Sequence, residues 1–265
     1  SSGAQKIIPY SDASLRCFQE AIHPWLHNLT QGYPDLGKSY FSISPVSRKA
    51  KKTKTGFPIG AANDAIYFGS NLHQSLAEIT LAPALLGQVT EISDWQRLTL
   101  TSWLRSTDLS LISVWSPSFI TALLSELPNY ADQIIGDIHD GSETSKSSFD
   151  TAGSLANPER AAVIDRAMAD NSLDTQQLWP NMQLISCWTH ASSARFIPEL
   201  KRLFPQVNIQ GKGLLSTEAV VSLPLINEPY PVLAVNSGFY EFLDQAENSY
   251  LAHELKPAET YEVVF

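Results

Sequence analysis

Hydrophobic positions in the first part of this chain follow two patterns, which together predict strands alternating with helices. The mostly apolar runs Leu109–Trp115 and Met182–Trp188 are typical of strands that are buried on both faces. Shorter strands are expected at Tyr40–Ile43 and Val207–Gln210. Between the strands, apolar side chains recur at helical spacing, which indicates amphipathic helices. The alternation predicts a mainly parallel sheet flanked by helices.

The first helix is expected to run from about Asp12 to Leu29, with a kink at Pro24. Its buried stripe is expected to comprise Leu15, Phe18, Ile22 and Leu26. Later helices are preceded by capping signals, namely a capping box at Ser93–Gln96, Ser116 followed by Pro117, Asn157 before Pro158, and Asp174 with Gln177. The capping box predicts a helix to about Ser106. Further helices are expected at His73–Leu86, Phe119–Leu127, Pro128–His139, Arg160–Ala169 and Ser192–Phe204.

From Gly213 onward the pattern changes to short strands. These are expected at Val232–Val235, Phe239–Leu243 and Tyr261–Phe265. The fold class is therefore α/β, with mainly parallel sheets and a smaller β-rich C-terminal part. We place the boundary between residues 1–210 and residues 211–265, which continue the same large domain. The chain lacks an initial methionine and ends inside an expected strand, so we expect it to be a segment of a longer protein.

Composition excludes several classes of partner. A formal net charge of −9 argues against nucleic acid, because phosphate contacts require a broad basic face. The basic run at residues 48–54 is interpreted as a solvated loop. No apolar run approaches the length of a membrane span and no signal peptide is recognised, so we expect a cytoplasmic protein without a membrane partner. Cys17 and Cys187 fit packed, reduced thiols, and the six histidines show no metal-ligand spacing.

A polar triplet stands out in the stretch Gly211–Leu225, where Ser216, Thr217 and Glu218 lie between pairs of apolar residues. In an open α/β sheet, a polar turn beside a strand end is a common position for a ligand site. Taken alone, the triplet also fits an ordinary surface turn at the edge of a core.

The N-terminus holds a second candidate. Ser1, Ser2 and Gly3, followed by Lys6, combine hydroxyl groups, free backbone N–H groups and one cation ahead of a hydrophobic stretch. This combination suits a phosphate cradle. Ser-Ser-Gly is also common in expression tags, so both interpretations remain open.

Three pieces of the chain, taken in order, resemble the auxin-responsive Gretchen Hagen family of acyl-acid amido synthetases. They are Ser1-Ser2-Gly3 with Lys6, Trp179–Thr189, and Gly213–Glu218. Further similar segments are Ile112–Phe119, Leu233–Ser237, Phe239–Phe242, Glu254–Pro257 and Tyr261–Val264. The resemblance extends over essentially the whole chain, and the bacterial branch of the family is the most similar in texture.

The resemblance implies a ligase of the acyl-adenylate-forming superfamily that uses ATP and Mg²⁺. Its members activate a carboxylic acid as an acyl adenylate and then transfer the acyl group to an amino acid amine. The acyl pocket is expected from the residues around Ile112–Phe119, with Trp95 and Trp103. Neither the acid, nor the acceptor, nor the oligomeric state follows from the sequence.

Individual roles are also implied by the resemblance. Thr217 matches a hydroxyl that contacts the α-phosphate, and Glu218 matches the carboxylate that holds Mg²⁺. Ser216 is expected to shape the nucleotide pocket beside them. The remaining residues expected to bind the nucleotide are Ser1, Ser2, Gly3, Lys6, Thr189 and His190.

The chain departs from the family pattern at Ala219, where glycine is frequent, although this change is small enough to preserve the site. The ribose-binding aspartate motif would fall after Phe265, and the C-terminal lid is absent, so this segment alone is not expected to complete the reaction. Two alternatives remain: a ligase of the same superfamily that forms thioesters with coenzyme A, and a non-catalytic nucleotide-binding relic.

Overall fold

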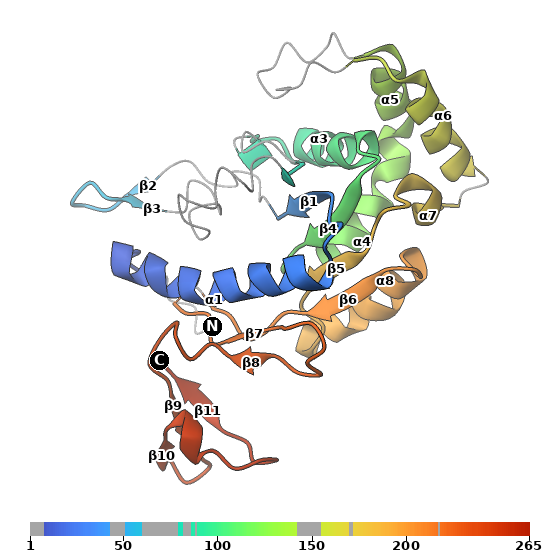
Figure 1. The fold of residues 1–265 in the computed structure, drawn as a ribbon. Helices are drawn as coiled ribbons and strands as arrows, with labels where there is room; N and C mark the ends of the chain where they lie inside the picture. Colours follow the sequence, from blue (N-terminus) through green and yellow to red (C-terminus); the bar gives the residue numbers. More distant parts are fainter. Residues whose placement is uncertain are drawn as a thin grey trace. The chain divides into compact units, whose positions relative to one another are not determined.

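The computed structural model describes residues 8–42, 51–59, 79–81, 86–87, 89–141, 155–169, 172–216 and 218–265. Contacts divide the chain into two compact units (Figure 1). The sheet unit comprises Asp35–Ile66 and Ser70–Lys212. The hairpin unit comprises Ser1–Pro34, Tyr67–Gly69 and Gly213–Phe265.

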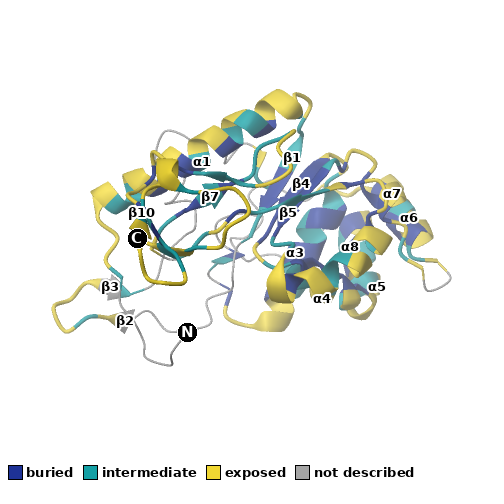
Figure 2. Cartoon of the chain, turned by 90° about the horizontal axis from the view of Figure 1, so that it is seen from below, coloured by how far each residue is buried: buried dark blue, intermediate teal, exposed yellow. Residues whose placement is uncertain are grey.

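Four parallel strands form the centre of the sheet unit, in the order β1-β4-β5-β6. They are β1 (Lys38–Phe41), β4 (Leu109–Ser113), β5 (Leu184–Cys187) and β6 (Asn208–Gly211). Every residue of β4 and β5 is buried, which confirms that these runs form inner strands covered on both faces (Figure 2). The parallel sheet confirms the predicted fold class.

Helices connect and cover these strands. They are α3 (Ile92–Arg105), α4 (Pro117–Ser125), α5 (Leu127–Asp140), α6 (Pro158–Ala167), α7 (Thr175–Leu178), the 3₁₀ helix η4 (Ala191–Phe196) and α8 (Ile197–Leu203). Three predicted N-caps are confirmed, since Ser116, Asn157 and Asp174 each accept a backbone N–H bond from the first turn.

Two predicted helices differ in detail. The capping box at Ser93 is wrong, because Trp95 N already bonds to Glu91 O and the helix begins two residues earlier than the box requires. The single helix expected from Ser192 to Phe204 is a 3₁₀ turn followed by α8, which carries Pro198 in its first turn. Proline lacks the N–H that would continue a preceding helix, so it favours a new start there.

Part of the predicted loop around the basic run forms a small antiparallel pair, β2 (Lys51–Lys52) with β3 (Pro58–Ile59). Gly56 lies in the turn between them with φ +94°, a conformation suited to glycine. Most of the helix expected at residues 73–86 falls outside the described residues, and Thr80, which is described, forms a parallel bridge with Ser39 instead of continuing a helix.

Large aromatic side chains fill the core of the sheet unit. Trp103 and Trp179 are fully buried and meet edge to face, with ring centroids 6.3 Å apart. The Trp179 indole N–H donates to the Trp103 carbonyl at 2.8 Å. The Tyr40 ring also meets Trp103 edge to face, with ring centroids 5.0 Å apart. This cluster joins β1, α3 and the segment after α7.

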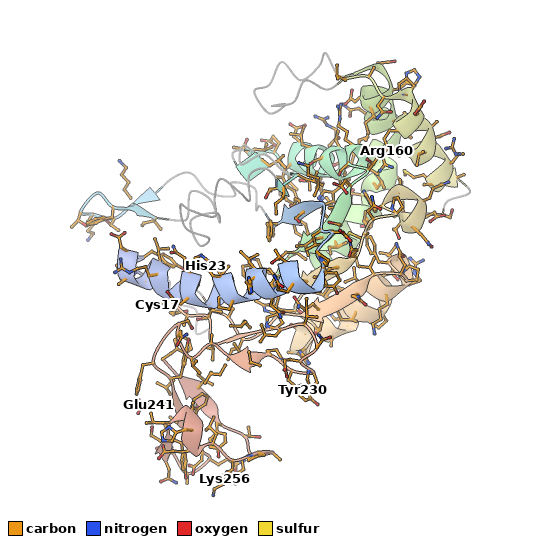
Figure 3. The ribbon with its side chains drawn as sticks, in the orientation of Figure 1. Cys17, His23, Arg160, Tyr230, Glu241 and Lys256 are labelled. Carbon is orange, nitrogen blue, oxygen red and sulfur yellow. The ribbon has the colours of Figure 1, made fainter. Side chains whose placement is uncertain are left out.

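Arg160 of α6 is a buried cation within this unit (Figure 3). Its guanidinium donates to three backbone carbonyls, those of Leu104, Ser106 and Leu178, at 2.6, 3.2 and 2.8 Å. Burial lowers the pKa of Arg160 from its ordinary value. The side chain therefore satisfies carbonyls at the end of α3 and the end of α7 at once.

The hairpin unit combines one long helix with short antiparallel strands. Its elements are α1 (Asp12–Gly32), β7 (Ser222–Leu223), β8 (Val232–Leu233), β9 (Glu241–Leu243), β10 (Ser249–Tyr250), the 3₁₀ helix η5 (Ala252–Glu254) and β11 (Glu262–Val264). Strand β9 pairs with both β10 and β11, and β7 pairs with β8. Strands β7 and β10 were absent from the sequence prediction, since two-residue strands leave little periodicity.

The buried face of α1 is rotated relative to the prediction. Phe18, Ala21, Trp25 and Leu29 are buried, whereas Leu15, Ile22 and Leu26 are half-buried. The helix passes through Pro24 and ends at Gly32, where a Cβ atom would come within 2.2 Å of the Ile226 side chain. Glycine at the C-terminal end of α1 thus permits the segment around Ile226 to pack closely against the helix.

A hydroxyl network holds the strands of this unit together. The Tyr240 hydroxyl donates to the Val220 carbonyl at 2.8 Å and lies 2.6 Å from Ser237 Oγ. Ser237 Oγ also reaches the carbonyls of Val220 and Ala234, each at 2.8 Å. Tyr240 and Phe242 pack with Val221 in a small apolar cluster beside these bonds.

Candidate functional site

The carboxyl ends of β4, β5 and β6 bring chemically active side chains to one edge of the parallel sheet. Ser113, Ser186 and Gln210 are register partners across the three strands, so their side chains share one face. The positions two residues further are Trp115, Trp188 and Lys212. The ladder continues past the strand ends, because Trp188 N bonds to Trp115 O and Lys212 N bonds to Cys187 O. The contacts among these three side chains show that they meet at this edge of the sheet.

Lys212 contacts a hydroxyl group and an aromatic ring at this edge. Its ammonium donates to Ser113 Oγ at 2.9 Å and lies 5.3 Å from the centroid of the Trp115 ring. The Trp115 ring is in turn 5.6 Å from that of Trp188. A cation over an indole face is attracted by the negative face of the ring, and a hydroxyl orients the ammonium. The result is a charged group held beside an aromatic pair.

Burial changes the acidity of both titratable groups here. Desolvation lowers the pKa of Lys212 to about 8, opposed by the neighbouring Cys187. Desolvation raises the pKa of the Cys187 thiol to about 11, opposed by Lys212. At neutral pH the lysine is thus charged and the thiol is neutral. Cys187 is a packed thiol, as the sequence predicts, whereas the same prediction is wrong for Cys17, which is exposed.

Thr189 and His190 lie in the turn that follows β5. Thr189 Oγ1 is 3.2 Å from His190 Nδ1, so the structure brings these two predicted residues together. A Cβ atom at Gly211 would come within 2.5 Å of Thr189 Oγ1, so a larger residue there would require the Thr189 side chain to move. Ala191 follows with φ +50°, a left-handed conformation that strains a residue with a Cβ. Strained turns of this kind are concentrated at functional sites.

The Ser216–Glu218 triplet belongs to the hairpin unit. Ser216 and Glu218 lie in a tight turn, because Leu215 and Val220 make an antiparallel bridge and Ser216 N bonds to Ala219 O at 2.9 Å. Ser216 Oγ accepts from the backbone N–H groups of Glu218 and Ala219, at 3.1 and 3.2 Å. The Ser216 hydroxyl therefore fixes the shape of the turn that displays Glu218.

The expected burial around this triplet is confirmed on one side. Val220 and Val221 are buried, whereas Leu214 is 55% exposed, so the apolar pair before the triplet does not belong to the core. Glu218 is exposed. Five predicted residues, Ser1, Ser2, Gly3, Lys6 and Thr217, lie outside the described residues.

The fit of a divalent cation can be judged from the donors present. Among the described residues, no group of three or more His, Cys, Asp or Glu side chains is placed to hold a metal ion. Mg²⁺ needs no such cage when a nucleotide supplies phosphate oxygens, since one or two carboxylates are then sufficient. The exposed carboxylate of Glu218 fits that requirement.

Trp95 and Trp103, which we expect to line the acyl pocket, lie in the core. Trp95 is 7% exposed and Trp103 is fully buried, and Trp95 packs edge to face on Phe119 at 5.6 Å. Within the described part of the chain, neither indole N–H has a hydrogen-bond partner. Trp115, from the same predicted region, is 38% exposed and lies at the sheet edge.

Sequence reasoning missed Lys212, Ser113 and Ser186 as site residues. The available signal was positional, because each lies near the carboxyl end of a predicted strand. Parallel strands place such ends at one edge of the sheet. What the sequence could not supply was the register that aligns Ser113 with Ser186.

Comparisons with known proteins point to one family. Residues 1–209 match the model described as the GH3 family N-terminal domain. The solved structure titled "AtGH3.15 acyl acid amido synthetase in complex with 2,4-DB" aligns with 100% of this chain at a TM-score of 0.84 and 18% identity. A second, titled "GH3.15 acyl acid amido synthetase", aligns with 98% of this chain at a TM-score of 0.77 and 17% identity.

The chain spans about half the length of these solved structures, covering 48% and 49% of them. A comparison with curated proteins found no match. The fold is therefore that of the matched part of these enzymes, and the bacterial branch stays a prediction. Within the described residues, no helix has both the length and the apolar content that crossing a membrane would require.

Proposed function

The chain belongs to the GH3 family, and from this premise we propose that it is the acid-activating part of an acyl-acid amido synthetase. The family match over residues 1–209 is the observation that carries this proposal. The substrates would be ATP with Mg²⁺, a carboxylic acid and an amino acid. The reaction would join the acid to the amine as an amide.

Activation is needed because a carboxylate is a poor acyl donor. In the proposed first step, a carboxylate oxygen attacks the α-phosphorus of ATP, and the bond to pyrophosphate breaks. The product is an acyl adenylate, a mixed anhydride with AMP as a good leaving group. In the second step the amine nitrogen attacks the acyl carbon, AMP departs, and the amine loses a proton. The protein must position the reactants and stabilise the charge on the phosphates.

We assign the phosphate-facing roles to the turn of the hairpin unit. Glu218 would hold Mg²⁺, which would neutralise phosphate charge during the displacement. Thr217 would donate its hydroxyl to the α-phosphate, and Ser216 would keep the turn in the shape that presents both side chains. The support for the last role is the pair of backbone N–H bonds that Ser216 Oγ accepts.

The remaining nucleotide contacts are proposed at two other places. The N-terminal segment would cradle phosphates through Ser1, Ser2, Gly3 and Lys6. The turn after β5 would lie near the adenine, with Thr189 and His190 held against each other. The strained backbone at Ala191 supports a functional role for this turn.

ATP–pyrophosphate exchange tests the proposal in the protein expressed from its whole gene. Exchange should depend on Mg²⁺ and on one class of acid from a panel of aryl, indole and fatty carboxylic acids. A folded protein that binds ATP but exchanges with no acid in the panel would argue for the non-catalytic alternative.

Glu218→Ala tests the proposed metal ligand. Exchange should fall by about 100-fold or more, because charge stabilisation at a transferring phosphoryl group is lost. Glu228→Ala is the matched control, since it removes another exposed carboxylate of the same unit. Full exchange activity in Glu218→Ala would refute the assignment.

Acceptor assays separate amide formation from thioester formation. With the acid identified by exchange, the protein should release AMP in the presence of one or more amino acids and form the corresponding amide. Release that depends on coenzyme A, and not on any amino acid, would identify a thioester-forming ligase.

A further inference from the structure

Two hydroxyl groups lie side by side on one face of the sheet edge. Ser113 and Ser186 are direct register partners on β4 and β5, so neighbouring strands place their side chains next to each other. Ser113 Oγ accepts a hydrogen bond from Lys212. Ser186 Oγ is fully buried and has no hydrogen-bond partner among the described residues. A buried hydroxyl without a partner costs about 1–3 kcal/mol, so a site for a bound ligand is a reason to retain it.

The surroundings of these hydroxyls indicate the kind of ligand. Lys212 contributes a positive charge, and the Ser186 hydroxyl contributes a hydrogen-bond donor on the neighbouring strand. Trp115 and Trp188 form an aromatic pair beside the cation. An organic carboxylate matches this arrangement, because it joins a singly charged oxyanion to a carbon skeleton that can lie on an aromatic surface. Inorganic phosphate would gain nothing from the aromatic pair.

We propose that Lys212 and Ser186 form the subsite that binds the carboxylate of the acid substrate. Lys212 pairs with one carboxylate oxygen, Ser186 donates its O–H to the carboxylate, and Ser113 orients the lysine. This inference rests on the proposed function for the identity of the acid as a substrate. The aromatic pair of Trp115 and Trp188 supplies the apolar surface next to the carboxylate.

Isothermal titration calorimetry without ATP tests the subsite directly in the protein expressed from its whole gene. The probes are benzoate and octanoate, each paired with its neutral amide, benzamide or octanamide. Lys212→Met should weaken binding of the preferred carboxylate by about 10- to 100-fold and leave the matching amide unchanged, because the lost interaction is charge-assisted. Lys201→Met, an exposed lysine on α8, is the matched control and should bind as the wild type does.

The acid–amide comparison distinguishes a binding role from a structural one. If Lys212 merely supported the fold, Lys212→Met would weaken carboxylate and amide equally, and that outcome would overturn the proposal. A loss of ATP affinity with unchanged carboxylate affinity would also overturn it, since the cation would then serve a phosphate. Wild-type protein that binds neither carboxylate would overturn it as well.

Ser186→Ala provides a second variant that removes a single oxygen atom from the core. It should weaken the carboxylate by about 3- to 10-fold and the amide by less, because a hydrogen bond to a charged acceptor is stronger than one to a neutral carbonyl. An unchanged carboxylate affinity would remove Ser186 from the subsite. Failure of the proposed function has a different signature: carboxylate binding would remain dependent on Lys212, while no acid would support ATP–pyrophosphate exchange.

Discussion

The sheet unit packs its parallel strands around large apolar side chains such as Trp103 and Trp179, whereas the hairpin unit has a core cluster of Val221, Tyr240 and Phe242. The short strands of the hairpin unit are joined by hydroxyl groups that bond to backbone carbonyls. The difference teaches that the sheet unit rests mainly on hydrophobic burial, while the hairpin unit, with its smaller core, depends more on specific hydrogen bonds that fix its turns.

Trp103→Ala should have the largest effect and should destabilise the sheet unit by about 4 kcal/mol, since a large cavity would form in a closely packed core. Native-state hydrogen exchange followed by peptide mass spectrometry reports the opening free energy of each unit separately. Protection should fall throughout the sheet unit. An equal loss of protection in the hairpin unit would show that the two cores unfold together.

Arg160→Met should cost about 3 kcal/mol, because it leaves the carbonyls of Leu104, Ser106 and Leu178 without their donor. Arg166→Met on the exposed side of α6 is the control. Urea unfolding measures the free energy of unfolding of both variants. A loss no greater than that of the control would mean that apolar packing alone holds this region.

Lys212→Met should stabilise the sheet unit at neutral pH, by an amount on the order of 2 kcal/mol. The folded pKa of Lys212 is about 8 and the ordinary value is 10.5, so the unfolded state binds more protons between these two pH values. The free energy of unfolding of the wild type should therefore rise with pH across that window. Below pH 8, where Lys212 is charged in both the folded and the unfolded state, the cost of burying its charge should be constant.

The measurement for Lys212 is the difference between wild-type and variant unfolding free energies from pH 7 to pH 10.5. The difference should shrink as pH rises, because the variant has no lysine to desolvate. Cys187, with its pKa raised to about 11, stays neutral over most of this range. If the unfolding free energies of the wild type and the variant change in parallel with pH, the lysine is not desolvated in the folded state.

Tyr240→Phe should have the smallest effect, a destabilisation of the hairpin unit by about 1–1.5 kcal/mol, because it removes the hydroxyl that bonds to the Val220 carbonyl. Tyr230→Phe, at a residue 76% exposed, should be neutral. Hydrogen exchange of the 220–243 peptides is the readout. Unchanged protection in Tyr240→Phe would show that the apolar cluster, and not the hydroxyl network, sets the stability of this unit.

Local features of the sequence predicted much of this structure. Ser116, Asn157 and Asp174 were recognised as caps because a cap depends on neighbours within one helical turn. The inner strands were recognised because both faces are apolar. The helix expected at Ser93 began at the wrong residue, since a capping motif in the first turn looks the same whether or not it starts the helix.

The candidate site was predictable only in part. The pattern of residues singled out the Ser216–Glu218 triplet and the family resemblance supplied its roles, but residues 1–7 and Thr217 lie outside the described residues, so their roles stay predictions. The edge formed by Ser113, Ser186 and Lys212 depends on strand register, which joins positions about 70 and 100 residues apart. No pattern local to one strand encodes such a pairing.

The uneven burial of the tryptophans gives the protein an optical signal of its own. Four of the six, Trp25, Trp95, Trp103 and Trp179, are at most 8% exposed, whereas Trp115 is 38% exposed. Water-exposed indoles emit at longer wavelength and meet acrylamide more often than buried ones. The red edge of the fluorescence spectrum therefore reports mainly on Trp115, whose ring lies beneath Lys212. A ligand at the sheet edge would shield it from the quencher, so occupancy can be followed without any label.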